Sequence, residues 1–285
     1  MRWEFGRRST NVEDRRGTGL SGPVVGGGIG TIVLALIVAF LGGDPSVVLQ
    51  QGRDRSDRPY SQSPQTQPTA ANDRMADFVS VVLADTEDTW NSLFQQMGKT
   101  YSEPTLVLYS DTVESACGYA RSAVGPFYCP GDRKLYIDLS FYRDLKYKFN
   151  APGDFAQAYV IAHEVGHHVQ NLMGITRQVQ TLQRQATRIE ANQLSVRQEL
   201  QADCFAGIWA NHANRSRQIL EEGDIEEALN AASSIGDDRL QSQAKGYVVP
   251  ETFTHGSSAQ RVRWFKQGIQ TGNPAKCNTF AVANP

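Results

Sequence analysis

A short stretch near the middle of the chain has the residue types and spacing of a catalytic zinc site. The sequence AHEVGHH occupies positions 162–168 and places His163 and His167 four residues apart. Because four residues turn an α-helix through about 400°, both imidazoles leave the same face, one turn apart. Two imidazoles placed in this way can bind a tetrahedral Zn²⁺, and Glu164 beside them can serve as the general base of a hydrolase. His168 is turned by about 140° from His163, so we do not expect it to join this site.

A second pair of residues at helical spacing offers the third ligand that a catalytic zinc requires. The stretch QELQADC at positions 198–204 places Glu199 and Asp203 four residues apart, on one face of a helical pattern. We expect Glu199 to bind the metal and Asp203 to accept the other ring N–H of a ligand histidine. Other candidates for the third ligand are His212 and His255. In the alternative interpretation, both carboxylates are solvated surface charges.

The composition and the motif spacing exclude several classes of protein. The metzincin peptidases need a third histidine six residues after His167, and this position holds Met173. The 285-residue chain has 28 Lys and Arg against 30 Asp and Glu, so it shows no basic excess for binding nucleic acid. Since 40% of its residues are hydrophobic, the chain is neither collagen-like nor wholly disordered. A folded globular protein remains.

The hydrophobic periodicity predicts a mainly helical α+β domain with a small sheet over residues 73–285. The expected elements are a helix at 74–97, strands at 104–109 and 134–139 around a hairpin-like loop at 117–133, a helix at 153–173, a helical pattern at 175–220, and helices at 224–235 and 257–270. We expect the edge of the strand at 134–139 to bind an extended peptide by strand addition. The segment at 177–198 either covers the site, binds a partner or is a solvated helix packed on one face.

The residues before this domain predict a membrane anchor followed by a tether. Residues 24–43 carry no charge, and about 20 residues suffice to cross the hydrocarbon core as a helix. Five arginines precede this segment, so the positive-inside rule places residues 1–23 in the cytoplasm and the domain outside it. A cleaved signal peptide is the alternative. The stretch at 44–72 is rich in Pro, Gln and Ser, and we expect a disordered linker there.

All four cysteines follow the predicted anchor. An even number of cysteines in a domain outside the cytoplasm suits two disulfides. The nearest pairing joins Cys117 to Cys129 and leaves Cys204 with Cys277, although four cysteines allow three connectivities. In the alternative interpretation, Cys204 is a small buried apolar residue on a helix.

Several motifs together resemble a family of bacterial neutral zinc metallopeptidases. They are the opening MRWEFGRRSTNVEDRR with the apolar segment after it, HEVGHHVQ, QELQADCFAG and FTHGSSAQRV, and they cover essentially the whole chain. HExxH followed by a helix with ExxxD is the gluzincin pattern, and it is similar to that of membrane-associated zinc peptidases. The resemblance implies a zincin-like peptidase domain that follows one transmembrane helix. It carries over His163, His167 and Glu199 as zinc ligands, Glu164 as the base and Asp203 as the outer partner of a ligand histidine.

His255, in the motif THGSSAQR, takes its expected role from the same resemblance. It falls where related peptidases have a His-Pro motif near the active site, but Gly256 stands in place of the proline. The resemblance implies oxyanion stabilisation or substrate contact by His255, and a structural histidine is the alternative. Tyr128 and Tyr136 are further candidates for the oxyanion donor. Arg261 is expected on the helix after His255, without an assigned role.

We therefore expect a membrane-anchored, zinc-dependent peptidase that acts on peptide or protein substrates and does not bind nucleic acid. One rival interpretation is a zinc-binding envelope scaffold without turnover, and another is an anchored module without metal. Glu164 favours the enzyme, because a structural zinc needs no adjacent base and usually has four protein ligands.

Overall fold

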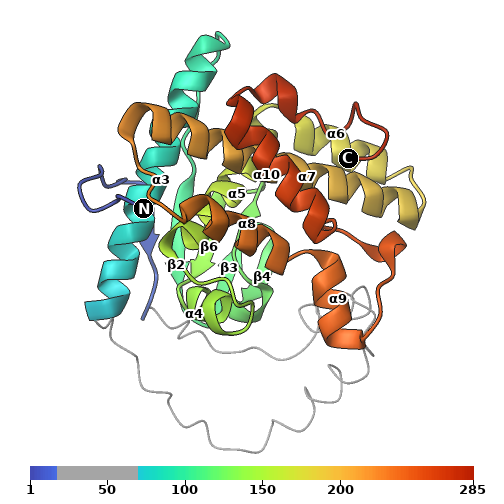
Figure 1. The fold of residues 1–285 in the computed structure, drawn as a ribbon, viewed down its shortest axis with the longest axis horizontal. Helices are drawn as coiled ribbons and strands as arrows, with labels where there is room; N and C mark the ends of the chain where they lie inside the picture. Colours follow the sequence, from blue (N-terminus) through green and yellow to red (C-terminus); the bar gives the residue numbers. More distant parts are fainter. Residues whose placement is uncertain (18–69) are drawn as a thin grey trace, which may run out of the picture. The chain divides into compact units, whose positions relative to one another are not determined.

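The computed structural model describes residues 1–17 and 70–285 and is mainly helical with two small β-sheets (Figure 1). This agrees with the predicted α+β class. The helices are α3 (Ala70–Gln96), α4 (Ser140–Tyr147), α5 (Asp154–Leu172), α6 (Ile175–Gln183), α7 (Arg188–Arg217), α8 (Asp224–Ser234), α9 (Asp237–Lys245) and α10 (Ser258–Thr271), with a 3₁₀ turn η3 (Pro274–Cys277) after α10. The strands are β1 (Val12–Asp14), β2 (Thr105–Tyr109), β3 (Thr112–Ser115), β4 (Gly118–Arg121), β5 (Phe127–Cys129) and β6 (Lys134–Asp138).

The predicted membrane segment at 24–43 and nearly all of the predicted linker at 44–72 lie outside the described residues. Within the two described ranges, no helix is both long enough and apolar enough to span a membrane. The membrane anchor and the cellular location of the domain stay predictions.

The larger sheet has the strand order β1-β2-β6-β5. β1 and β6 both run parallel to β2, whereas β5 runs antiparallel to β6. β6, which covers most of the strand predicted at 134–139, is therefore an inner strand, and the expectation that its edge binds a peptide is wrong. β5 is the edge strand on that side of the sheet.

Alternating side chains divide this sheet between two hydrophobic clusters. Leu106 of β2 and Leu135 and Ile137 of β6 are buried in the main core together with the helices. Tyr136, which lies between Leu135 and Ile137 in β6, belongs to a smaller hydrophobic cluster that includes Val113 of the β3–β4 hairpin. This period of two residues is the pattern on which the prediction of the strand was based.

Glycines let three helices approach closely enough to build one site. α7 lies against α5 at Gly166, where an added Cβ would stand 3.0 Å from the carbonyl oxygen of Ala202. α10 lies against α7 at Gly268, where an added Cβ would stand 2.0 Å from the carbonyl oxygen of Cys204. Real Cβ atoms do not come that close to backbone, so a larger residue at position 268 would push the two helices apart.

The start of the chain folds together with the rest of the domain. Residues 1–15 and 69–285 form one compact unit, in which β1 adds a strand to β2. The expected boundary at residue 73, with a separate segment at 1–23, is therefore corrected.

Side-chain contacts hold this first segment in place. Trp3 is buried and packs edge-to-face on Phe78 of α3, with ring centroids 5.3 Å apart. Arg7 donates a hydrogen bond to Glu87 of α3 at 2.9 Å. Arg7 belongs to the arginines behind the predicted cytoplasmic location, and in the structure it takes part in an ion pair within the fold.

Both expected disulfides are present. Cys117 pairs with Cys129 of β5, and Cys204 of α7 pairs with Cys277 of η3. The first pair ties the loop after the β3 strand to the edge of the larger sheet. The second pair fixes the segment after α10 to the middle of α7.

The packing of residues 1–15 predicts a difference between two aromatic residues in the same segment. Trp3→Ala should lower the free energy of unfolding by about 3 kcal/mol, because it removes a large buried side chain. Phe5→Ala should change it by less than about 0.5 kcal/mol, because Phe5 is fully exposed. Denaturant unfolding of the full chain measures both values, and equal values for the two variants would contradict the packing.

Candidate metal centre

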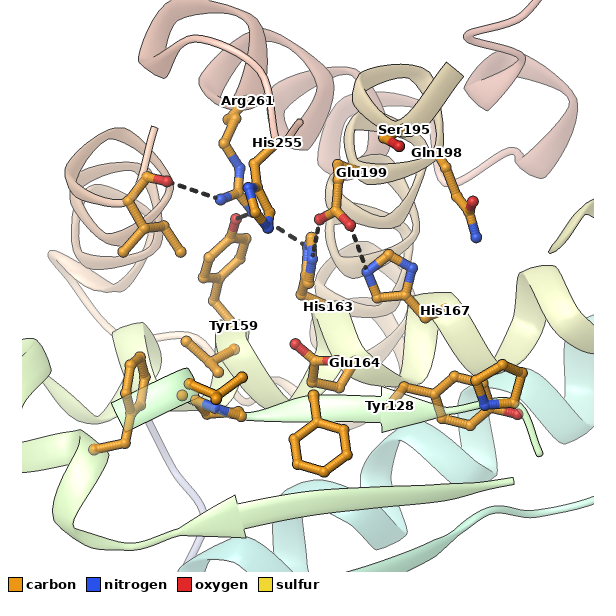
Figure 2. A pocket seen from close by; sticks show the side chains of 18 of the residues that line it. Tyr128, Tyr159, His163, Glu164, His167, Ser195, Gln198, Glu199, His255 and Arg261 are labelled. Atoms are coloured by element: carbon orange, nitrogen blue, oxygen red, sulfur yellow. Dashed lines mark hydrogen bonds and ion pairs between the residues drawn. The ribbon is translucent and has the colours of Figure 1, made fainter. Parts of the chain in front are cut away.

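Helix α5 presents both histidines of the HEVGH motif to one cavity (Figure 2). The ring centroids of His163 and His167 are 4.8 Å apart. His168 is fully buried, and its Nε2–H donates to the carbonyl oxygen of Ser102 at 2.6 Å. It therefore joins α5 to the segment before β2 and stays outside the metal centre, as the helical rotation predicts.

Helix α7 brings Glu199 to the same point. Its Oε2 lies 3.1 Å from His163 Nε2, and its Oε1 lies 3.4 Å from His167 Nε2. Around a tetrahedral Zn²⁺ with ligands at about 2.0–2.1 Å, neighbouring ligand atoms are about 3.4 Å apart. The three side chains therefore fit a zinc ion with one position left for water or substrate. His212 lies elsewhere, with its Nε2 2.8 Å from the carbonyl oxygen of Gly272.

Asp203 holds His163 in the tautomer that a metal ligand needs. Its Oδ1 accepts the Nδ1–H of His163 at 2.8 Å, so that the neutral ring carries its lone pair on Nε2. Tyr159 donates to the same carboxylate at 2.5 Å, and Arg261 donates to both of its oxygens at 2.9 Å. Burial raises the pKa of Asp203, but Arg261 and His163 outweigh burial and bring this pKa to about 2. The carboxylate is thus ionised and fully bonded.

Tyr159 and Arg261 are not assigned a role from the sequence. Tyr159 precedes His163 by four residues, so helical spacing alone could have placed it on the ligand face of α5. Arg261 has no such signal, because its guanidinium reaches Asp203 only through the close contact between α10 and α7. Both side chains are buried at the cavity wall.

The second ligand histidine also has an outer partner. His167 Nδ1 donates to Oε1 of Gln170 at 2.9 Å, and Gln170 is fully buried. Both ligand histidines are therefore oriented by a bond on the far side of the ring. Gln170 stands three residues after His167 in the motif HEVGHHVQ, on the same helical face, and this spacing is a signal that could have found it.

The carboxylates beside the two histidines favour a positive charge at this point of the cavity. Burial lowers the pKa of His167, but the Glu199 carboxylate outweighs burial and raises this pKa to about 9. Burial also lowers the pKa of His163, but the Asp203 carboxylate outweighs burial, so this pKa is raised as well. Burial raises the pKa of Glu199, but the two histidines hold it well below its ordinary value. The carboxylates of Glu199 and Asp203 therefore favour a positive charge at this point.

These groups line a cavity of about 580 Å³. Apart from Arg261, Glu164, His255 and the three residues of the metal centre, its lining side chains are uncharged. Aromatic and aliphatic residues include Phe127, Phe141, Phe149, Val160 and Leu240, and the polar residues of α6 and α7 are Thr176, Gln180, Gln183, Ser195 and Gln198. The segment at 177–198, whose role the sequence leaves open, therefore contributes a wall of the cavity.

Glu164 and His255 both face this cavity (Figure 2). The side chain of His255 is 53% exposed, and its Nδ1 lies 3.3 Å from Asp237 Oδ1. Asp237 Oδ2 accepts the backbone N–H groups of His255 at 2.6 Å and Gly256 at 3.0 Å, which fixes the loop before α10. Gly256 has φ +91°, a value that proline cannot adopt because its ring fixes φ near −65°. The loop conformation thus explains why glycine replaces the proline of the His-Pro motif.

The two tyrosines expected as oxyanion donors are used in other ways. The hydroxyl of Tyr128 accepts from Asn171 at 2.9 Å and bonds to Nδ1 of His168 at 3.0 Å. Tyr136 donates its hydroxyl to Asp132 at 2.7 Å and does not line the cavity. His255 also lines the cavity, and its Nδ1 faces Thr254 and Asp237. Its Nε2 has no hydrogen-bond partner among the described residues, so His255 is the candidate donor of the three that keeps a free ring nitrogen.

Comparison with known proteins agrees with this geometry. The family described as “Putative neutral zinc metallopeptidase” matches residues 1–280. The chain is 53% identical to the “Uncharacterized protein YpfJ” of Escherichia coli strain K12, over 98% of this chain and 99% of that protein. It is 43% identical over 217 residues to the “Uncharacterized protein Mb2605” of Mycobacterium bovis and the “Uncharacterized protein Rv2575” of Mycobacterium tuberculosis, covering 73% of this chain and 72% of each relative. No solved structure matches. The chain belongs to the neutral zinc metallopeptidase family.

Proposed function

We propose that this protein is a zinc-dependent peptidase in which His163, His167 and Glu199 hold the metal. The observation that supports this most directly is the convergence of the three ligand atoms, all within 4.8 Å of one another, at the wall of a cavity that could admit a peptide. A zinc ion bound there would act as a Lewis acid that activates water and polarises the carbonyl of the scissile bond. Family membership supports the same assignment.

Glu164 is the proposed general base. It follows the ligand His163 directly in the chain and lines the same cavity. Its carboxylate takes a proton from the attacking water and passes it to the nitrogen of the leaving amine. These two transfers complete the hydrolysis of a peptide bond without a covalent intermediate on the protein.

The edge strand β5 is the proposed binding surface for the substrate backbone. β5 pairs with β6 on one side only, and residues 124–128 and 130 line the cavity. An extended peptide could add to this edge by main-chain hydrogen bonds, as in other cases of strand addition. Unfolded or flexible polypeptides are therefore the proposed substrates, because a folded protein presents few unpaired strands.

His255 is the proposed donor to the oxyanion of the tetrahedral intermediate. Burial lowers the pKa of His255, but Asp237 and Glu199 outweigh burial and raise it above the ordinary value. A raised pKa favours the protonated ring, which can donate from Nε2 while Nδ1 faces Asp237. Asp237 would then position the ring for this role.

Zinc content tests the ligand assignment. The full chain should bind about one zinc, and Glu199→Ala should lose it or bind it much more weakly. Within residues 1–17 and 70–285, a second cluster that could hold a metal consists of Asp154, Asp224 and Glu227. Glu227→Ala is therefore the matched control, and it should keep the zinc. Metal analysis after dialysis measures both variants. An unchanged zinc content in Glu199→Ala would show that the third ligand lies elsewhere.

The role of Glu164 predicts a separation of binding from turnover. Glu164→Gln should keep its zinc and lose at least about 100-fold of peptide hydrolysis, because the amide cannot accept the proton. Glu226→Gln, an exposed residue of α8, should retain full activity. A peptide-library digest followed by mass spectrometry measures the rates. Undiminished hydrolysis in Glu164→Gln refutes the mechanism, and a wild type that binds zinc but cleaves nothing supports the zinc-binding scaffold instead.

The role of His255 predicts a change confined to the chemical step. His255→Ala should lower kcat by about 10- to 100-fold with little change in KM, since an oxyanion donor acts mainly in the transition state. Zinc content should stay the same, and His212→Ala should leave kcat unchanged. Steady-state kinetics on a peptide identified in the digest gives both constants. An unaltered kcat in His255→Ala would identify His255 as a structural residue.

A further inference from the structure

A row of buried amides runs from the metal centre to the segment after α10. It begins at His167, whose Nδ1 donates to Gln170 Oε1 at 2.9 Å. Gln170 Nε2 donates to Gln201 Oε1 at 3.1 Å, and Gln201 Nε2 donates to the carbonyl oxygen of Cys277 at 2.9 Å. Gln170 has no exposure to solvent and Gln201 only 5%, so water does not compete for these bonds. The row joins α5, α7 and η3.

The direction of this row is fixed by backbone carbonyls. The carbonyl of Cys277 can only accept, so Gln201 must turn its NH₂ group toward it and its oxygen toward Gln170. Gln170 must then turn its NH₂ group toward Gln201, where it also meets the carbonyl oxygen of Gln198 at 2.7 Å. The side-chain oxygen of Gln170 therefore faces His167 and accepts a hydrogen bond from its Nδ1–H. In the neutral ring that binds a metal, the lone pair of His167 is therefore on Nε2, the nitrogen that faces Glu199.

The outer end of the row is anchored to α7. Cys277 forms a disulfide with Cys204, and both cysteines are fully buried. The side chain of Thr279 donates to the carbonyl oxygen of Arg197 at 2.6 Å, on the same helix. The carbonyl of Cys277 is thereby held at a fixed position relative to Gln201. Cys204 is also the neighbour of Asp203, which orients the other ligand histidine.

We propose that Gln170 and Gln201 are positioning residues for His167. Through their hydrogen bonds, the carbonyl of Cys277, which the disulfide holds in place, fixes which nitrogen of His167 is free to bind the metal. This inference rests on the proposed metal site and adds that metal affinity depends on residues that do not bind the metal. The Cys204–Cys277 disulfide contributes to affinity through the same row. Outer partners of ligand histidines commonly change metal affinity by about 10- to 100-fold when they are removed.

Two leucine variants test the row with metal binding as the readout. Gln170→Leu should weaken zinc binding by about 10- to 100-fold, because His167 loses its partner. Gln201→Leu should weaken it less, by about 3- to 10-fold, because Gln170 keeps the carbonyl of Gln198. The matched controls are Gln157→Leu on α5 and Gln193→Leu on α7, which should stay within about twofold of the wild type. Gln157 lies near the start of α5, and Gln193 is exposed.

The measurements are a zinc titration against a chelator of known affinity and the visible spectrum of the Co²⁺-loaded full chain. The spectrum reports ligand geometry and should shift in Gln170→Leu and Gln201→Leu but not in the controls. A role limited to core packing would lower thermal stability without shifting the cobalt spectrum. If Gln170→Leu does not fold, the result for the milder Gln201→Leu decides the question.

A pair of double variants tests the anchor. Cys204→Ser with Cys277→Ser should weaken zinc binding by about 3- to 10-fold. Cys117→Ser with Cys129→Ser removes the other disulfide, outside the row, and should stay within about twofold. Zinc affinities and cobalt spectra equal to those of the wild type in both glutamine variants would overturn this inference alone. A wild type that binds no metal would instead overturn the proposed function on which it rests.

Discussion

One buried carboxylate, Asp203, joins the three helices on which the site depends. It stands on α7, binds Tyr159 and His163 of α5, and binds Arg261 of α10. A charge without exposure to solvent is costly unless it is paired and fully hydrogen-bonded. The folded state therefore tolerates Asp203 only when α5 and α10 both lie close against α7. The glycine contacts of these helices allow that approach, and the same approach brings Glu199 to the two histidines.

The two histidines proposed as ligands, His163 and His167, are held by different chemistry. His163 bonds to an ionised carboxylate that a buried arginine balances, whereas His167 bonds to a neutral amide in a row that ends on a backbone carbonyl. An ionised partner makes an imidazole a stronger donor to a metal, and a neutral partner fixes its direction with less effect on charge. The proposed centre thus combines one charged and one neutral outer partner with the carboxylate of Glu199. Both arrangements place the lone pair on Nε2, toward Glu199.

The parts of the site that lie on one helix could be predicted from the sequence. His163 and His167 share a face because of the helical period, and so do Glu199 and Asp203. Strands β2 and β6, most of the longer helices and both disulfides were also predicted from local patterns of hydrophobicity and cysteine spacing. The other strands and the helices α4 and α9 were not predicted. That these two helices meet was expected because a catalytic zinc needs a third ligand, and the family resemblance implies the same. No local pattern in the sequence indicates that Arg261 or Gln201 completes the site. These contacts depend on how closely the helices approach one another. The glycines allow that approach, but the sequence does not show which helix each glycine faces.

The corrected predictions share a cause of the same kind. The strand at 134–139 was expected at an edge because its own pattern says nothing about what pairs beside it, and β5 supplies that partner. The first residues were assigned to a separate segment because their arginines match a membrane signal, whereas Trp3 and β1 make contacts with residues more than 70 positions away. Pairing across long sequence distances is decided by the whole fold and leaves little local trace.

Diffraction from crystals of the zinc-loaded full chain, collected on both sides of the zinc absorption edge, would locate the metal. One strong anomalous peak is expected between the Nε2 atoms of His163 and His167 and the carboxylate of Glu199. A peak at the cluster of Asp154, Asp224 and Glu227 alone, or at a site formed between molecules in the crystal, would contradict the proposed metal site.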